Sequence, residues 1–178
     1  MLQAAEFGQW QRQRSAPSAV LKIALRPPQK ASKSTKTKKS ARPLTMTEPK
    51  RGGCQCGQIK YELRREPLGL AVCHCKECQR QSGSAFSMSL AVPGGAFQLR
   101  SGVLKTFEVM CDSGRIKTCA FCPECGTRIY HETENGMSVK AGTLDDTSWL
   151  KPDSHYWTMR KQSWVVIPDG VSQFTDDG

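Results

Sequence analysis

The sequence predicts a mainly β protein, with one zinc-stapled domain of twisted antiparallel sheets and a disordered basic segment at its N-terminus. Short stretches with strand chemistry follow one another between residues 58 and 141, and Gly, Pro and Ser separate them. Helix signals are confined to one short stretch. Seven of the nine cysteines fall into three tight clusters, a spacing that suits metal chelation better than a disulfide framework.

Seven segments carry the strand prediction. Residues 58–63 alternate polar and apolar side chains, as a half-buried strand does. The other six expected strands are 86–92, 97–99, 104–109, 116–121, 128–130 and 137–141. Ser113-Gly114 predicts a hairpin turn between the fourth and fifth of the seven. One or two helical turns are expected after Cys75, through Ser82.

The charge distribution divides the chain. Residues 1–46 carry ten Lys or Arg and a single acid, Glu6, whereas the remaining residues are nearly neutral at +1. Few apolar residues occur in the first part, so it cannot offset its ordering entropy and is expected to be disordered. We therefore expect a basic extension (1–46), a zinc-binding domain (47–170) and a short C-terminal tail (171–178).

Three interpretations of residues 1–46 stay open: a solvated tail or upstream start ahead of Met46, a mitochondrial presequence, and a weak polyanion-binding or nuclear-targeting arm. We see no secretory signal and no apolar run of membrane-spanning length, so no membrane partner is expected. The cysteine usage favours a reducing compartment. The expected location is the cytoplasm, or the mitochondrion if the extension is a presequence. Nucleic-acid binding is not expected of the nearly neutral domain.

Two cysteine pairs predict a closed metal site. Each pair lies in a short turn, and a glycine follows its second cysteine, which lets backbone N–H groups face the sulfurs. Thiolates are the soft ligands that zinc prefers, and four of them complete a tetrahedral structural site. The four expected ligands are Cys54, Cys56, Cys122 and Cys125.

The third cluster, Cys73, Cys75 and Cys78, supplies three ligands to a second zinc. A zinc ion with three protein ligands keeps a position for water or substrate, as catalytic zinc does. The alternative is a second closed site, completed by Cys111, Cys119 or a histidine. His74 alternates with two of the ligands and is expected to point away from the metal.

Polar residues directly after this triplet indicate an anion-binding segment. Arg80, Ser82 and Ser84 combine a basic side chain with small hydroxyls, and they could contact the carboxylates of a substrate. A solvated Arg80 is the alternative interpretation.

The cysteine motifs within residues 52–62, 73–86 and 121–131 together resemble the glutathione-dependent formaldehyde-activating enzyme family, whose domain is shared with centromere protein V. The resemblance extends over about residues 48–168 and does not cover the basic extension. It implies an Mss4-like fold with two zinc ions per chain. By motif, the two pairs match the structural zinc ligands and the triplet matches the catalytic ones.

The resemblance also implies a carbon–sulfur lyase, an S-(hydroxymethyl)glutathione synthase, with glutathione as the thiol substrate and formaldehyde as the aldehyde. Glutathione's sulfur would take the fourth position at the second zinc, and displaced water or His74 would supply a proton to the new alkoxide. Two rivals remain: a zinc-stapled binding module for chromatin, microtubules or client proteins, and a related lyase or carrier for another thiol adduct.

Overall fold

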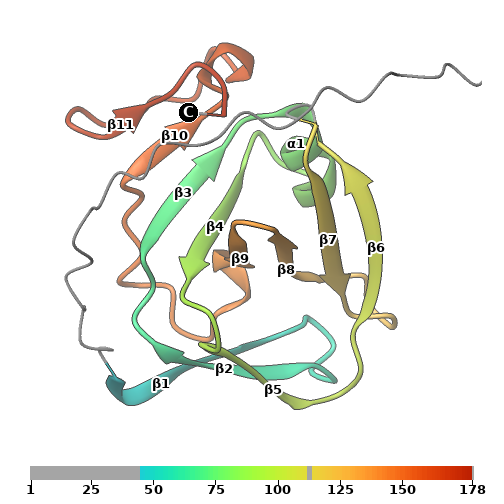
Figure 1. The fold of residues 1–178 in the computed structure, drawn as a ribbon. Coiled ribbons are helices and arrows are strands. Elements are labelled where there is room, and N and C mark those ends of the chain that lie inside the picture. Colours follow the sequence, from blue (N-terminus) through green and yellow to red (C-terminus); the bar gives the residue numbers. More distant parts are fainter. Residues whose placement is uncertain (1–44, 112–113, 178) are drawn as a thin grey trace, which may run out of the picture. The chain divides into compact units, whose positions relative to one another are not determined.

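The computed structural model describes residues 45–111 and 114–177, and the side chains from residue 48 onward. These residues form two β-sheets and one short α-helix (Figure 1). The three-stranded sheet has the order β1-β2-β5, with β1 at Thr45–Gly53, β2 at Lys60–Arg65 and β5 at Phe97–Ser101. The predicted mainly β fold is confirmed.

The larger sheet has eight strands in the order β11-β10-β3-β4-β9-β8-β7-β6. Its strands are β3 (Gly69–Cys73), β4 (Ser87–Val92), β6 (Lys105–Met110), β7 (Ile116–Phe121), β8 (Arg128–Thr133), β9 (Gly136–Lys140), β10 (Ser154–Tyr156) and β11 (Ser172–Gln173). Pairing is antiparallel except at β10, which runs parallel to both β3 and β11. Figure 1 shows the sheet curling so that β6 and β7 stand opposite β3 and β4.

Each of the seven predicted strands is present, and its observed ends lie within two residues of the predicted ones. The exception is β8, which continues to Thr133. The predicted hairpin joins β6 to β7. The expected helical turns form α1 (Lys76–Ser82), which has Cys75 as its N-cap and ends at Gly83 with φ 60°. Two single-turn 3-10 helices follow, at Ala141–Thr143 and Thr158–Arg160.

The two faces of the large sheet have different roles, which the strand register assigns. Leu70, Leu90 and Val139 are directly paired or neighbouring positions on one face, and they pack into the hydrophobic core. Tyr61 and Leu63 of the three-stranded sheet belong to the same core and are nearly fully buried. The core therefore lies between the sheets and leaves the inner, curled face of the large sheet for other uses.

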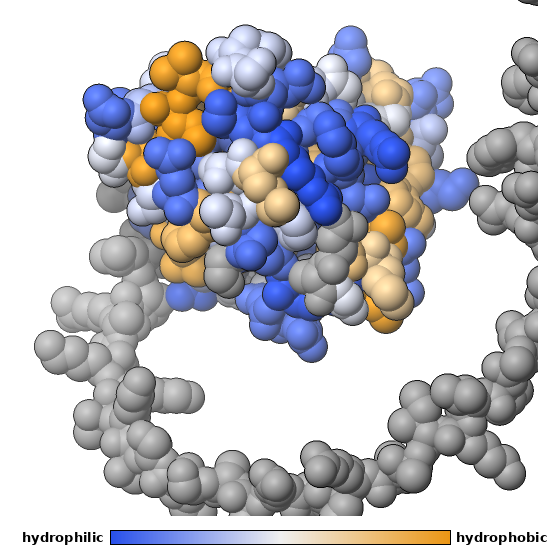
Figure 2. Space-filling model, turned by 90° about the horizontal axis from the view of Figure 1, so that it is seen from above, coloured by the Kyte–Doolittle hydropathy of each residue, from blue (hydrophilic) through white to orange (hydrophobic). Residues whose placement is uncertain are grey.

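The surface seen from above in Figure 2, on the side where β10 and β11 lie in Figure 1, is largely hydrophilic. Its hydrophobic residues form small separate groups. No helix among residues 45–111 and 114–177 is long and apolar enough to cross a membrane.

The structure bears differently on the two predicted end segments, the basic extension and the C-terminal tail. The basic extension, residues 1–46, lies outside the described residues except for its last two. Residues 171–178 were expected to form a tail, but Ser172–Gln173 is β11, and the Phe174 ring stacks on Tyr156 at 4.8 Å between centroids. This short segment therefore packs on the edge of the large sheet.

Candidate metal centre

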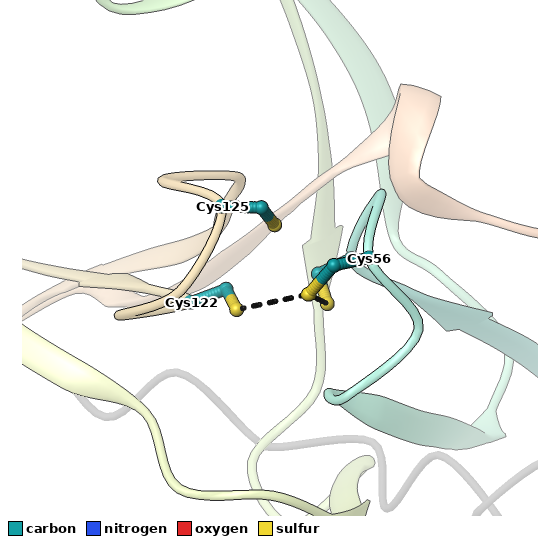
Figure 3. Close-up of side chains that lie close together, drawn as sticks. Cys56, Cys122 and Cys125 are labelled. Atoms are coloured by element: carbon teal, nitrogen blue, oxygen red, sulfur yellow. Dashed lines mark hydrogen bonds between the residues drawn. The ribbon is translucent and has the colours of Figure 1, made fainter.

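The two cysteine pairs meet at one point, although 66 residues separate Cys56 from Cys122. All four sulfurs lie within 4.8 Å of one another, and the side chains converge from two loops (Figure 3). Cys56 Sγ is 3.4 Å from Cys54 Sγ and 3.7 Å from Cys122 Sγ. Such a set of four thiols fits a tetrahedral zinc ion.

Backbone geometry holds each pair in a tight turn. Gly57 and Gly126 have φ of 81° and 72°, a conformation that glycine adopts without strain. The N–H of Ile59 donates to Cys54 Sγ at 3.2 Å, and the N–H of Gln55 reaches across to Thr127 Oγ1 at 3.2 Å. The hydroxyl of Thr127 lies 3.2 Å from Cys125 Sγ, and this hydrogen bond is the main cause that lowers the pKa of Cys125 to about 5. The turns therefore favour the thiolate, the form that binds metal, at Cys54 and Cys125. The backbone hydrogen bond from Gln58 lowers the pKa of Cys56, but the neighbouring thiols, Cys54 first among them, outweigh it and raise that pKa to about 12.

The triplet occupies the junction of β3 and α1. Cys73 ends β3, Cys75 caps the helix by accepting a 3.4 Å hydrogen bond from the N–H of Cys78, and the three sulfurs lie within 4.8 Å of one another. Hydrogen bonds from Cys73 and Cys78 lower the pKa of Cys75 to about 2, whereas hydrogen bonds with Cys75 and Cys78 raise the pKa of Cys73. The three thiols thus share negative charge, which a divalent cation would neutralise.

No fourth Cys, His, Asp or Glu ligand atom joins the triplet within 4.8 Å in residues 48–111 and 114–177. Cys119 is fully buried on β7, and Cys111 follows β6. The described residues therefore leave the triplet with three ligands, consistent with an open site.

Hydrogen bonds fix the triplet loop to the C-terminal part of the fold. His74 is fully buried, and its Nε2 lies 2.9 Å from Nδ1 of His155 on β10. The N–H of His74 donates to the Tyr156 carbonyl at 3.0 Å, and Gln79 Nε2 donates to the His74 carbonyl at 2.7 Å. The loop is therefore positioned by protein contacts as well as by any metal.

A hollow on the inner face of the large sheet adjoins the triplet, and it has two lobes. The lobes share Glu77, Cys78, Lys117 and His131. We name the larger one, of about 420 Å³, the aromatic lobe; its lining includes Ala71, Ser89, Ala91, Ser138, Tyr156 and Trp157. We name the other, of about 350 Å³, the basic lobe; its lining includes Arg80, Lys117, Cys119, Arg128, His131 and Lys140.

The basic lobe concentrates positive charge. Four cationic side chains, Arg80, Lys117, Arg128 and Lys140, face one acid, Glu77. Lys140 is 7 % exposed, and its Nζ donates to Ser87 Oγ and Ser89 Oγ at 3.0 Å each. Burial lowers the pKa of Lys140, although Cys78 raises it in part. Burying an ammonium is costly even when it is hydrogen-bonded, and ionisable groups buried in a hollow in this way are typical of functional sites.

His131 lines both lobes as an uncharged ring. Burial is the first cause that lowers its pKa to about 3, and the nearby Lys140, Lys117 and Arg128 act in the same direction. The ring is therefore neutral at pH 7, and it is available for hydrogen bonds without adding charge.

The predicted anion contacts lie in different places. Arg80 lines the basic lobe, whereas Ser82 Oγ donates to the Cys78 carbonyl at 2.7 Å and to the Phe86 carbonyl at 2.9 Å. Within the described residues, neither lobe is lined by Ser82 or Ser84. The sequence reasoning missed the basic residues on β7, β8 and β9, namely Lys117, Arg128 and Lys140. Their position opposite the triplet follows from sheet order, which no local motif shows.

Comparisons with known proteins give one clear finding. The family model described as "Glutathione-dependent formaldehyde-activating enzyme" matches residues 49–160. A crystal structure of a Rhodobacter sphaeroides protein, a structural genomics target, matches with 19% sequence identity and a TM-score of 0.44, covering 57% of this chain and 91% of that chain. No curated protein matches the chain significantly.

Proposed function

Because the chain belongs to the glutathione-dependent formaldehyde-activating enzyme family, we propose that it is a zinc-dependent carbon–sulfur lyase. It joins or cleaves glutathione and formaldehyde as S-hydroxymethylglutathione. The observation that carries this proposal is the triplet: three clustered thiols open directly onto a hollow with a basic lobe. A purely structural zinc site would have no need of that hollow.

Two zinc ions per chain fit the donor sets. We assign Cys54, Cys56, Cys122 and Cys125 to a structural zinc and Cys73, Cys75 and Cys78 to a catalytic zinc. When bound by the triplet, zinc would offer a fourth position to the sulfur of glutathione and would lower the pKa of that thiol.

The basic lobe is the proposed site for the carboxylates of glutathione. Arg80 and Arg128 can each bind a carboxylate through two parallel hydrogen bonds. Lys117 and Lys140 add positive charge that does not require a particular orientation of the carboxylate. Cys78 belongs to the lobe lining, so a carboxylate held there keeps the rest of the tripeptide near the triplet. Arg80 is retained from the sequence prediction, and Arg128 takes the place that Ser82 and Ser84 were expected to fill.

The addition forms a bond between the glutathione sulfur and the carbonyl carbon. The π electrons of the C=O bond move to the oxygen, which takes up a proton equivalent to the one that the thiol released; the cleavage is the reverse. Lys117 lines both lobes, and we assign its ammonium to stabilising the negative oxygen. Burial opposes its charge, but Cys111, Cys78 and other cysteines more than offset this and raise its pKa. His74 lines neither lobe among the described residues, so we assign the proton to solvent rather than to His74.

Paired variants test the proposal. Arg128→Gln should raise the Kd for glutathione about tenfold, which corresponds to about 1.4 kcal/mol, because a charged carboxylate partner is lost. Arg100→Gln is the matched control: this arginine lies on β5, where it pairs with Glu62 at 3.6 Å, and it lines neither lobe. Calorimetry gives the affinities, and exchange NMR between formaldehyde hydrate and the glutathione adduct gives the rate.

Protein-dependent exchange that is lost in Cys78→Ser supports the lyase. A folded protein with two zinc ions that neither binds glutathione nor speeds exchange would instead favour the zinc-stapled binding module.

A further inference from the structure

The aromatic lobe is larger than formaldehyde requires. Its volume is about 420 Å³, whereas a water molecule takes about 30 Å³ of liquid volume and formaldehyde has only two heavy atoms. The basic lobe already offers charge for the carboxylates of glutathione. The aromatic lobe is lined by all three cysteines of the triplet, whereas the basic lobe is lined by only one of the three, Cys78, so a group carried on a sulfur held at the triplet would extend into the aromatic lobe.

Small side chains at paired positions keep this lobe open. Ala71 pairs with Ser89 across β3 and β4, and Ala91 pairs with Ser138 across β4 and β9. All four line the lobe, in strands whose opposite face carries large core residues such as Leu70 and Leu90. Protein interiors are normally close-packed by their own side chains. Four small neighbouring side chains on one face therefore form a floor that leaves room for part of a bound molecule.

Trp157 forms an aromatic wall and carries backbone strain. Its φ is 57°, and it is the only non-glycine residue with positive φ among the described residues. The conformation is unfavourable for a residue with a side chain and persists only where surrounding contacts hold it. The N–H of Trp157 donates to the Asp176 carbonyl at 2.9 Å, and its indole Nε1 donates to Asp177 Oδ1 at 3.0 Å. These hydrogen bonds hold the strained residue, and with it a large flat side chain, at the lobe.

The charges of the aromatic lobe balance. Arg115 forms an ion pair with Asp177, and the other two charged side chains, Lys117 and Glu77, are of opposite sign and also line the basic lobe. Tyr156 adds a second aromatic ring. An uncharged, apolar group suits this lining, whereas an anion suits the neighbouring lobe.

We propose that the aromatic lobe binds the carbon chain or ring of an uncharged aldehyde larger than formaldehyde, with Trp157 as a specificity-determining wall. This inference rests on the proposed function and widens its substrate class to hemithioacetals of glutathione with multi-carbon aldehydes. The chemistry is unchanged: one sulfur–carbon bond forms, the carbonyl π pair moves to oxygen, and a proton is transferred from thiol to oxygen. No oxidant or reductant is involved.

Stable thioethers test the lobe without requiring turnover. Calorimetry on the zinc-loaded full chain would compare glutathione, S-methylglutathione and S-hexylglutathione. Each buried CH₂ contributes about 0.8 kcal/mol, so partial burial of five extra carbons should make the hexyl conjugate bind at least about tenfold tighter than the methyl conjugate. Ala91→Leu fills the floor and should bring this ratio back towards one.

Trp157→Asn provides a second variant that should fold, because asparagine tolerates positive φ. It should reduce the hexyl-to-methyl preference about fivefold, whereas Trp164→Asn, which removes a 69 % exposed tryptophan outside the lobe lining, should leave the preference unchanged.

Equal affinity for the two thioethers, or a hexyl preference that survives both Ala91→Leu and Trp157→Asn, would overturn this inference while leaving glutathione binding intact. Absence of binding by glutathione and both thioethers would overturn the proposed function as well.

Discussion

The two cysteine clusters use the same ligand atom but differ in what else holds their ligands together. The paired cluster joins loops that follow β1 and β7, and between the loops we find a hydrogen bond from Gln55 N–H to Thr127 Oγ1 and the sulfur contact of Cys56 with Cys122. The triplet lies within six residues, and buried hydrogen bonds tie its loop to β10. In one cluster the metal would supply long-range structure, whereas in the other the protein supplies it and leaves the metal free for chemistry.

The largest expected effect comes from breaking the paired cluster. Cys122→Ser should unfold or aggregate the protein, because Cys122 is fully buried and zinc binding at a closed site contributes about 10 kcal/mol or more of folding free energy in small zinc domains. Circular dichroism and metal analysis would measure the outcome. A soluble, cooperatively melting Cys122→Ser protein would show that the sheets hold these loops without metal.

Breaking the triplet should cost much less stability. Cys75→Ser should remain folded, lose about one zinc per chain and fail to take up glutathione, because His74 and Gln79 still anchor the loop. Thermal melts and metal analysis beside the Cys122→Ser sample give a direct comparison. If both variants unfold equally, the second zinc is structural and the distinction between the clusters fails.

An intermediate effect concerns the pH dependence that His131, which lines both lobes, gives to stability. His131 has a folded-state pKa of about 3, below the ordinary value of 6.5, so its contribution to stability is full above pH 6.5 and is lost as pH falls towards 3. Between pH 7.0 and 5.5 the wild type should lose about 1 kcal/mol more unfolding free energy than His131→Asn. Urea unfolding of both proteins at each pH would show it, and metal loss common to both cancels in the difference. Identical pH slopes would mean that His131 titrates normally.

Much of this arrangement could be predicted from the sequence, for physical reasons. Strand and turn patterns are local, so the strand at residues 116–121 and the hairpin around Gly114 could be predicted from neighbouring residues alone. The cysteine clusters could also be predicted, because their close spacing in the sequence is what indicates metal binding. The strand β3 was missed because a short apolar run, Gly69–Cys73, ends inside a metal motif. The three-residue β10 is too short to show a period.

The hollow could not be predicted in the same way. Lys117, Arg128 and Lys140 belong to three different strands, and they gather only because the order β4-β9-β8-β7 places the strands side by side. Likewise, Ala71 and Ala91 show no pattern in the sequence until the register pairs them with serines. Sites that depend on long-range pairing require the structure.

The smallest expected effect is that of the basic extension. Removing residues 1–45 should leave the melting temperature, zinc content and glutathione affinity unchanged, since this segment has few apolar residues to add to a core. Its removal should instead change location or weak binding to polyanions. A truncated protein that becomes insoluble would show that the extension packs against the domain.

Metal content under graded chelation tests the central distinction most directly. The purified protein should hold two zinc ions per chain, and a mild chelator should remove one first while circular dichroism stays unchanged, because an open three-thiol site releases its ion before a closed four-thiol site. Adding glutathione should protect that first ion. A single tightly held zinc, or two ions that leave together with loss of the fold, would contradict the account.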